Sequence, residues 1–137
     1  MNSATLRLVL LVSCAHGLVH VYEHSFASVE QLVGADADFS IPPERQKQVT
    51  GTLGSCLRFP FGVFALLAGW LADRWGAKRL LITYLLGASV ACAMVWFAPA
   101  LGALYVAMFA LGVAASIYHP AGVGLISLHT NPENRTM

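Results

Sequence analysis

The sequence has very little charge: Asp, Glu, Lys and Arg together make up only 11% of its 137 residues. Soluble domains have about 25% charged residues, so this composition does not suit a surface in water. The eight basic and seven acidic residues nearly balance, to a formal net charge of +1. That balance offers no basic surface for nucleic acid, and no nucleic-acid-binding motif is present. Composition therefore favours a membrane protein.

Cysteine and catalytic motifs are also scarce. The three cysteines, Cys14, Cys56 and Cys92, lie far apart in apolar stretches, which excludes a disulfide framework and indicates small packing residues. No Gly-x-Ser-x-Gly, phosphate-binding loop or zinc-ligand spacing occurs. We therefore expect no enzyme activity, no cofactor and no resident metal.

Four long apolar segments take the place of the missing charge. They cover residues 8–33, 49–72, 80–98 and 101–128, and each reaches the length of about 17–25 residues that crosses a membrane. An open strand could not satisfy its backbone in lipid, so each segment is expected to be helical. The segment 34–48, with three acidic residues and a Pro-Pro pair, is a polar connection. The predicted fold class is an all-α membrane protein with four transmembrane helices.

The distribution of Lys and Arg predicts how these helices cross the membrane. With the amino terminus inside, the inner side would hold Arg7, Arg74, Lys78, Arg79 and Arg135. The outer side would hold Arg45 and Lys47. Basic residues favour the cytoplasmic side, so we predict a multi-pass protein of the cell (inner) membrane with a cytoplasmic amino terminus.

The stretch GWLADRWGAKRLL, residues 69–81, forms the turn between the second and third segments. Its basic residues fit a cytoplasmic turn, but Asp73 stands at the carboxyl end of a helix, where the helix dipole disfavours an anion. Gly76 can supply a positive φ to the turn, and Gly69 allows another helix to approach closely. A cytoplasmic turn thus accounts for the basic residues, but it does not by itself account for Asp73, Gly69 and Gly76.

This turn resembles the signature loop of the major facilitator superfamily of secondary transporters, roughly G-x-L-a-D-r-x-G-r-k-x-x-l. The matching residues are Gly69, Leu71, Asp73, Arg74, Gly76, Lys78 and Leu81. Ala77 departs from the pattern, because a basic residue is usual there, and Arg79 supplies a charge two positions later. Two other stretches, HGLVHVYEHSFASV and YHPAGVGLIS, resemble the fosmidomycin-resistance type of drug efflux transporter.

The resemblance implies a larger fold than these 137 residues. Major facilitator transporters have twelve helices in two halves, and each half contains two inverted three-helix repeats. This chain corresponds to the first repeat and the opening helix of the second, so we expect a partial amino-terminal domain over residues 1–137. The implied partners are a small organic solute, protons, the lipid bilayer and the remainder of the transporter. A four-span interaction subunit, a self-associating small transporter and an inactive remnant remain alternatives.

The resemblance also implies a role for the turn as a cytoplasmic latch. The residues of this loop latch are Gly69, Asp73, Arg74, Gly76, Lys78 and Arg79. Asp73 would face the positive amino end of a helix in the other half, and the basic residues would pair with acidic groups there. Such contacts would hold the outward-open state and loosen during the alternating-access cycle.

The first apolar segment contains four ionisable residues, which are costly in a membrane and therefore indicate function. At 100° per residue, His16, His20, Glu23 and His24 lie within a wedge of about 100°. Arg58 in the second segment has the same depth as Glu23, about 15 Å from the outer end, so an ion pair is expected.

His119 in the fourth segment lies at a depth similar to that of His16, so a central cavity lined by these side chains and the first segment's polar face is expected. Pro120 is expected to kink the same segment and to free a carbonyl near Ser116. Interrupted helices at mid-depth often mark binding or hinge regions in transporters, although ordinary helix packing also uses proline.

The histidines allow three functional interpretations. Imidazole beside a carboxylate can bind and release a proton near neutral pH, which favours proton coupling. Histidines at i, i+4 and i+8 can also offer nitrogens to a metal ion, although no Cys or Asp completes a ligand set. A hydrogen-bonded polar seam that only orients the helices is the third interpretation. The sequence alone leaves all three open.

Overall fold

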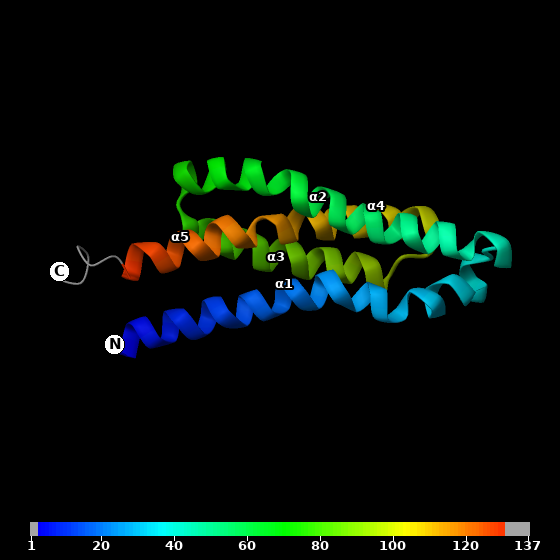
Figure 1. The fold of residues 1–137 in the computed structure, drawn as a ribbon, viewed down its shortest axis with the longest axis horizontal. Helices are drawn as coiled ribbons and strands as arrows, with labels where there is room; N and C mark the ends of the chain where they lie inside the picture. Colours follow the sequence, from blue (N-terminus) through cyan, green and yellow to red (C-terminus); the bar gives the residue numbers. More distant parts are fainter. Residues whose placement is uncertain (1–2, 131–137) are drawn as a thin grey trace.

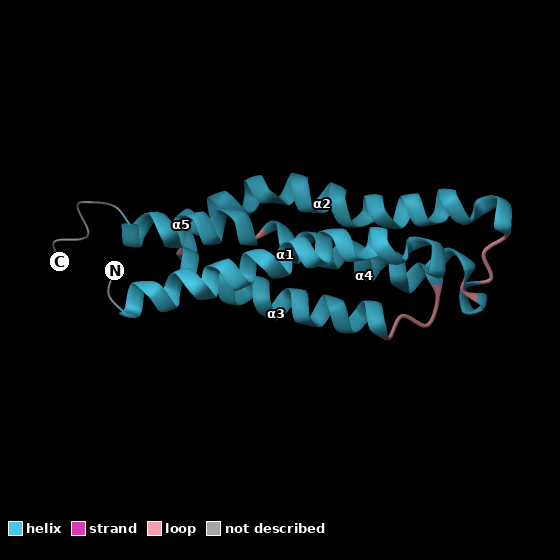
Figure 2. Cartoon of the chain, turned by 60° about the horizontal axis from the view of Figure 1, so that its bottom comes forward, coloured by secondary structure: helices cyan, strands magenta, loops and turns pink. Residues whose placement is uncertain are grey.

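The computed structural model describes residues 3–130, and every regular element there is helical (Figure 1, Figure 2). The elements are α1 (Ser3–Ala35), η1 (Ala37–Phe39), η2 (Pro43–Arg45), α2 (Gln46–Trp75), α3 (Ala77–Trp96), α4 (Leu101–Ser116) and α5 (Tyr118–Thr130). Four stretches are long and apolar enough to cross a membrane, the last of them formed by α4 and α5 together. The predicted all-α class with four apolar membrane helices is therefore confirmed.

The fourth apolar stretch, expected at 101–128, is interrupted at Ile117 rather than bent within one helix. Pro120 has no N–H to donate to the carbonyl of Ser116, so the regular bonding pattern cannot continue there. Just before this point, the N–H of Ile117 donates to the carbonyl three residues earlier, that of Ala114, at 3.3 Å. The hydroxyl of Ser116 donates to the carbonyl of Val113 at 2.7 Å, which adds a side-chain bond at the break.

The helices run up and down in a long bundle (Figure 1). The start of α1, the turn from α2 to α3 and the end of α5 lie at one end, and the η1–η2 connection and the turn from α3 to α4 lie at the other. The helix α2 packs most extensively on α4, α3 packs on α4 and α5, and α1 contacts α2 and α5. Four crossings therefore bring the start of α1 and the end of α5 to the same end of the bundle, as expected for a multi-pass membrane protein.

Small side chains make many of the contacts between the helices, and large apolar ones face outward. Ala88, Ala107 and Ala121 are completely buried. By contrast, Leu66 is 83% exposed and Trp96 is 82% exposed. Lipid is as apolar as leucine, so membrane helices associate through close packing of small residues rather than through burial of large ones. The outward apolar surface thus suits contact with lipid or with other membrane helices.

Candidate functional site

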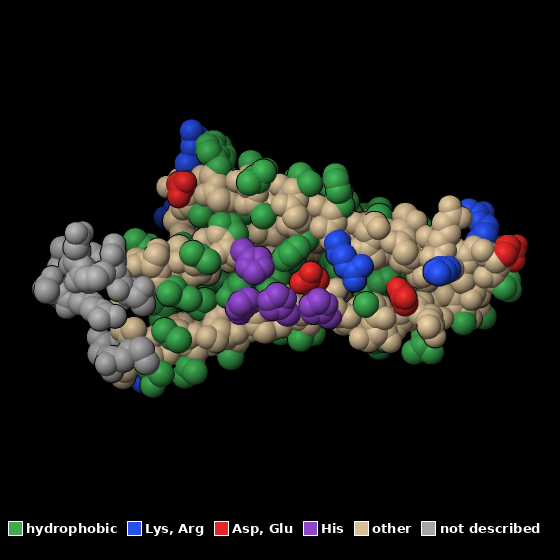
Figure 3. Space-filling view, viewed as in Figure 1, with side chains coloured by type: hydrophobic (Ala, Val, Ile, Leu, Met, Phe, Trp, Pro, Cys, Tyr) green, Lys and Arg blue, Asp and Glu red, His purple; other side chains and the backbone are tan. Residues whose placement is uncertain are grey.

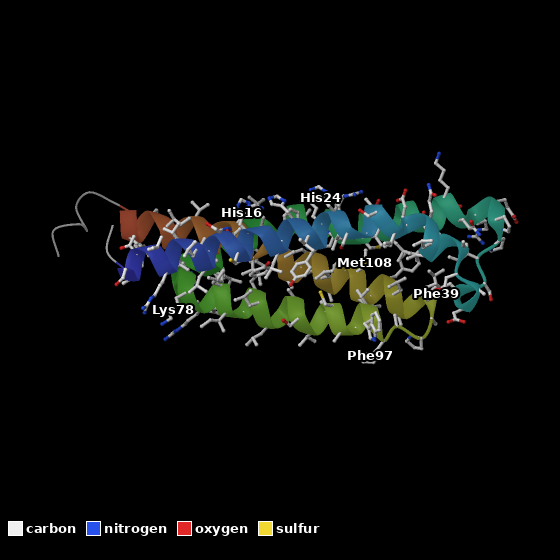
Figure 4. The ribbon with its side chains drawn as sticks, turned by 90° about the horizontal axis from the view of Figure 1, so that it is seen from below. His16, His24, Phe39, Lys78, Phe97 and Met108 are labelled. Atoms are coloured by element: carbon white, nitrogen blue, oxygen red, sulfur yellow. The ribbon has the colours of Figure 1, made fainter. Side chains whose placement is uncertain are left out.

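The polar residues of α1 form a row on one side of the helix. This histidine cluster consists of His16, His20, Glu23 and His24 from α1 and His119 from α5. Figure 3 shows the histidine side chains gathered on one face of the molecule, and Figure 4 shows His16 and His24 along the same edge of α1. The side chains of His20, Glu23 and His24 are 48%, 27% and 69% exposed.

A continuous chain of polar contacts links three of these residues. The Nε2 atoms of His16 and His20 are 3.0 Å apart, and Nδ1 of His20 is 3.3 Å from Oε2 of Glu23. Nε2 of His24 lies 3.9 Å from the same carboxylate oxygen. His20 thus uses both ring nitrogens, one toward His16 and the other toward Glu23. The spacing of three or four residues along a helix brings these side chains onto one face.

His119 brings α5 to the cluster, although it lies 95 or more positions after the cluster residues of α1. Its ring centroid lies 5.7 Å from that of His16 and 6.2 Å from that of His20, both in edge-on arrangements. Phe61 of α2 lies on another side of His119, with the ring centroids 5.7 Å apart. The cluster therefore lies where α1, α2 and α5 meet.

Two buried tyrosines, which the sequence analysis did not single out, hold α1 in place beneath the cluster. The hydroxyl of Tyr84 in α3 donates to the carbonyl of Ala15 at 3.1 Å, and that of Tyr118 donates to the carbonyl of Val12 at 2.9 Å. A carbonyl has two lone pairs, so each can accept this bond beside its helical one. The ring of Tyr118 also stacks on His16, with centroids 5.3 Å apart. A buried tyrosine needs a hydrogen-bond partner, which is the signal that could have identified both residues.

The expected ion pair between Glu23 and Arg58 does not form within the described chain. Glu23 instead contacts His20 and His24. Arg58 is exposed, and its Nη1 lies over Gly54 of its own helix, 3.5 Å from where a side chain would begin. Equal depth places two residues at the same level but does not decide which partner each side chain takes, and Glu23 takes its partners from its own helix.

The loop latch surrounds the tight turn between α2 and α3. Gly76 has a φ of +84°, the left-handed region that favours glycine, and its N–H donates to the carbonyl of Ala72 at 3.0 Å. Lys78 and Arg79 are exposed at this end of the bundle, and Figure 4 shows Lys78 there. The guanidinium of Arg74 lies 4.1 Å above the ring of Trp70.

The packing of Ala77 explains why the basic residue of the signature is missing there. Ala77 is only 7% exposed, and a side chain added to Gly124 of α5 would start 3.3 Å from its methyl group. A long basic side chain at position 77 would therefore collide with α5 or displace it. The adjacent Lys78 and Arg79 supply the exposed charge instead.

A groove of about 520 Å³ opens beside Asp73, between the end of α2, the start of α3 and α5. Its lining includes Gly69, Asp73, Pro120 and Gly124. No atom of the described chain lies within 4 Å of a side chain built at Gly69, so the close helix contact expected there does not come from residues 3–130. Pro120 lines this groove together with Asp73, and it directly follows His119 of the histidine cluster, so α5 connects the two sites.

Four apolar stretches long enough to cross a membrane, with a polar cluster where α1, α2 and α5 meet, define a multi-pass membrane protein with a polar site among its helices. Residues 32–137 match the Major Facilitator Superfamily, which is most of the chain, and the protein belongs to that family. The match includes the loop latch, but the polar residues of α1 precede it. No solved structure matches the chain.

One curated relative gives a more specific comparison. The chain is similar to a protein of Cupriavidus necator described as "Probable sulfoacetate transporter SauU", with 35% identity over 63 residues. The matched part is 46% of this chain and 15% of the relative, so the comparison covers a small fraction of that protein.

Proposed function

We propose that this chain forms the amino-terminal helices of a transporter that exports a small organic solute in exchange for protons. Membership of the Major Facilitator Superfamily supports transport by alternating access. The resemblance of the first and fourth apolar segments to the fosmidomycin-resistance type supports export. The similarity to a probable sulfoacetate transporter makes a small organic acid the first substrate class to test.

The observation behind proton coupling is the contact chain from His16 through His20 to Glu23. When His16 donates from Nε2 to Nε2 of His20, the other nitrogen of His20 can donate to Glu23. Every contact is then satisfied, and Glu23 is ionised. Each neutral imidazole has one N–H, so one ring nitrogen of His20 donates while the other accepts.

A second arrangement of the same atoms differs by one proton. When Glu23 is protonated, its O–H donates to Nδ1 of His20, and Nε2 of His20 donates to His16. A proton accepted at Glu23 can therefore leave at the free nitrogen of His16 while His20 passes it from one ring nitrogen to the other. The relay spans seven positions of α1, or about 10 Å along the membrane normal.

Orientation forms part of this proposal. We place the amino terminus, the loop latch and the end of α5 in the cytoplasm of the cell (inner) membrane, because Arg7, Arg74, Lys78 and Arg79 lie at that end of the bundle. Arg135, the fifth basic residue predicted for the inner side, lies outside the described residues. Glu23 then faces the outer side, where protons are more abundant in a respiring cell.

Proton movement in inside-out membrane vesicles tests the proposal directly. Vesicles from cells that produce the protein are energised to an acidic lumen, and sulfoacetate or fosmidomycin is added. Solute entering the lumen should be matched by protons leaving it, so a pH-sensitive dye should report a rise in luminal pH. Vesicles without the protein are the control. Uptake of either probe that leaves luminal pH unchanged would contradict proton exchange, and failure of both probes to enter would contradict this substrate class.

The loop latch is proposed to regulate the inner gate of the same transporter. Asp73 is exposed beside the open groove, and Gly69 leaves room there for the end of another helix. An anion at a helix amino end gains about 0.3–1 kcal/mol when exposed, and up to about 2 kcal/mol when partly buried. Arg74, Lys78 and Arg79 would pair with acidic groups across the groove.

Replacing Asp73 by Asn is expected to reduce the initial rate of solute uptake by about 5- to 30-fold. Loss of 1–2 kcal/mol shifts a two-state equilibrium by about that factor. The amount of protein in the membrane should stay unchanged, because Asp73 is exposed and has no packing role. Asp38→Asn, in the connection at the opposite end, is the matched control. Equal rates for the wild type and Asp73→Asn would contradict the latch.

A further inference from the structure

Three side chains of the histidine cluster form a set of metal ligands. His20, Glu23 and His24 each offer one ligand atom, and these atoms all lie within 4.8 Å of one another. We propose that they bind one divalent transition-metal ion, with Zn²⁺ as the best fit. Histidines at i, i+4 and i+8 supply only nitrogens, and the structure adds the carboxylate of Glu23 to His20 and His24.

The distances suit a tetrahedral ion. Zn²⁺ binds nitrogen and oxygen at about 2.0–2.2 Å, so two ligand atoms of a tetrahedral site lie about 3.3 Å apart. Nδ1 of His20 and Oε2 of Glu23 are already 3.3 Å apart, and Nε2 of His24 lies 3.9 Å from the same oxygen. The three ligand atoms lie within 4.8 Å of one another, and His24 is 69% exposed, so its ring has room to turn inward toward both partners.

His16 would support the site by contacting the ligand His20 rather than the ion itself. Its Nε2 lies 3.0 Å from Nε2 of His20, and when His20 donates that hydrogen, its Nδ1 keeps a lone pair aimed at the ion. Hydrogen bonds of this kind fix the tautomer and orientation of metal-binding histidines. The metal would thus occupy the position that a proton between His20 and Glu23 otherwise fills.

The ligand types select the metal. Two imidazoles and one carboxylate suit Zn²⁺ and its neighbours among the transition metals, whereas Mg²⁺ and Ca²⁺ prefer sets made of oxygen. Three protein ligands leave a fourth position, which water or an oxygen of an organic acid can take. Since the ligands must be unprotonated, acid should weaken binding of the metal.

Metal binding needs no proton gradient and no transported solute, so it can be tested apart from the proposed function. The purified chain in detergent is titrated with Zn²⁺ alone in a calorimeter at neutral pH. We expect one ion per chain. Glu23→Gln, His24→Ala and His24→Gln should each weaken binding at least about tenfold, since even a lost second-layer partner costs about 10- to 100-fold. His129→Ala is the matched control, because His129 contacts the carbonyl of Leu125 at the end of α5, away from the cluster.

The outcomes separate the site from general affinity for metal. Absence of a saturable Zn²⁺ site, or unchanged affinity in both His24 variants, would overturn the proposal. Equal weakening by His129→Ala would overturn it as well, because that result would place the ion elsewhere or assign it to a global change. Helical circular dichroism without metal shows whether each variant is folded, and His24 is exposed, so its replacement should leave the fold intact.

Discussion

Glu23→Gln should abolish proton-driven accumulation of solute while the protein remains folded in the membrane. Glutamine has the same shape as glutamate, and its amide oxygen can still accept the hydrogen bond from His20, now 3.3 Å from the carboxylate. It cannot take up a proton at any physiological pH. The substitution therefore keeps the geometry of the cluster and removes the group that starts the relay.

The expected size of this effect follows from the energy in the gradient. One pH unit is worth about 1.4 kcal/mol per proton, which supports about tenfold accumulation of solute for each proton exchanged. Inside-out vesicles with an acidic lumen should reach that ratio with the wild type. With Glu23→Gln the ratio should fall to about one, while downhill exchange of labelled for unlabelled solute continues. Both quantities are measured in the same vesicles with radiolabelled probe.

Glu30 provides a matched control on the same helix. It lies seven residues further along α1, about 10 Å from Glu23, and it lines a polar groove at the end of the bundle opposite the loop latch rather than contacting a histidine. Glu30→Gln should keep the full dependence on pH. Gradient-driven accumulation that survives Glu23→Gln would show that the proton acceptor lies elsewhere and would leave the histidine cluster as a seam that only orients helices.

Local sequence features predicted the helices and the polar face of α1. Membrane helices follow from unbroken apolar runs, which need no knowledge of neighbouring helices. The grouping of His16, His20 and Glu23 follows from 100° per residue within a single helix. Pro120 predicted an irregularity near Ser116, and the structure has a break at Ile117, although the sequence predicted one kinked helix rather than two separate helices. All of these features depend on one stretch of chain at a time.

Contacts between helices were harder to predict, because they depend on how each helix is rotated about its axis. Depth alone suggested a pair between Glu23 and Arg58, but Glu23 contacts His20 and His24 of its own helix instead. The bonds from Tyr84 and Tyr118 to carbonyls of α1 depend on the same rotation, and nearly 70 and more than 100 residues separate the partners. The space beside Gly69 could not be foreseen either, because within residues 3–130 nothing fills it.

Gly112→Ala should destabilise the bundle strongly, although it adds only one methyl group. Gly112 of α4 lies directly against α2 at Pro60, and a side chain built there would overlap the backbone carbonyl of Leu57 and come within 2.7 Å of the proline ring. A backbone carbonyl and a proline ring cannot turn aside as a flexible side chain can. The two helices would have to separate, and α2 and α4 share the most extensive contact in the chain.

Overpacking of this kind typically costs about 1–3 kcal/mol, and the loss should appear as a lower midpoint of unfolding when the protein in mild detergent is titrated with dodecyl sulfate. Gly102→Ala is the control, because Gly102 lies in the first turn of the same helix and a side chain built there meets nothing within 4 Å. Alanine favours a helix over glycine by up to about 1 kcal/mol, so the control should be as stable as the wild type or more so. If both variants unfolded at the same midpoint, α4 would have room to move away from α2, and the close contact at Gly112 would not be what holds these helices together.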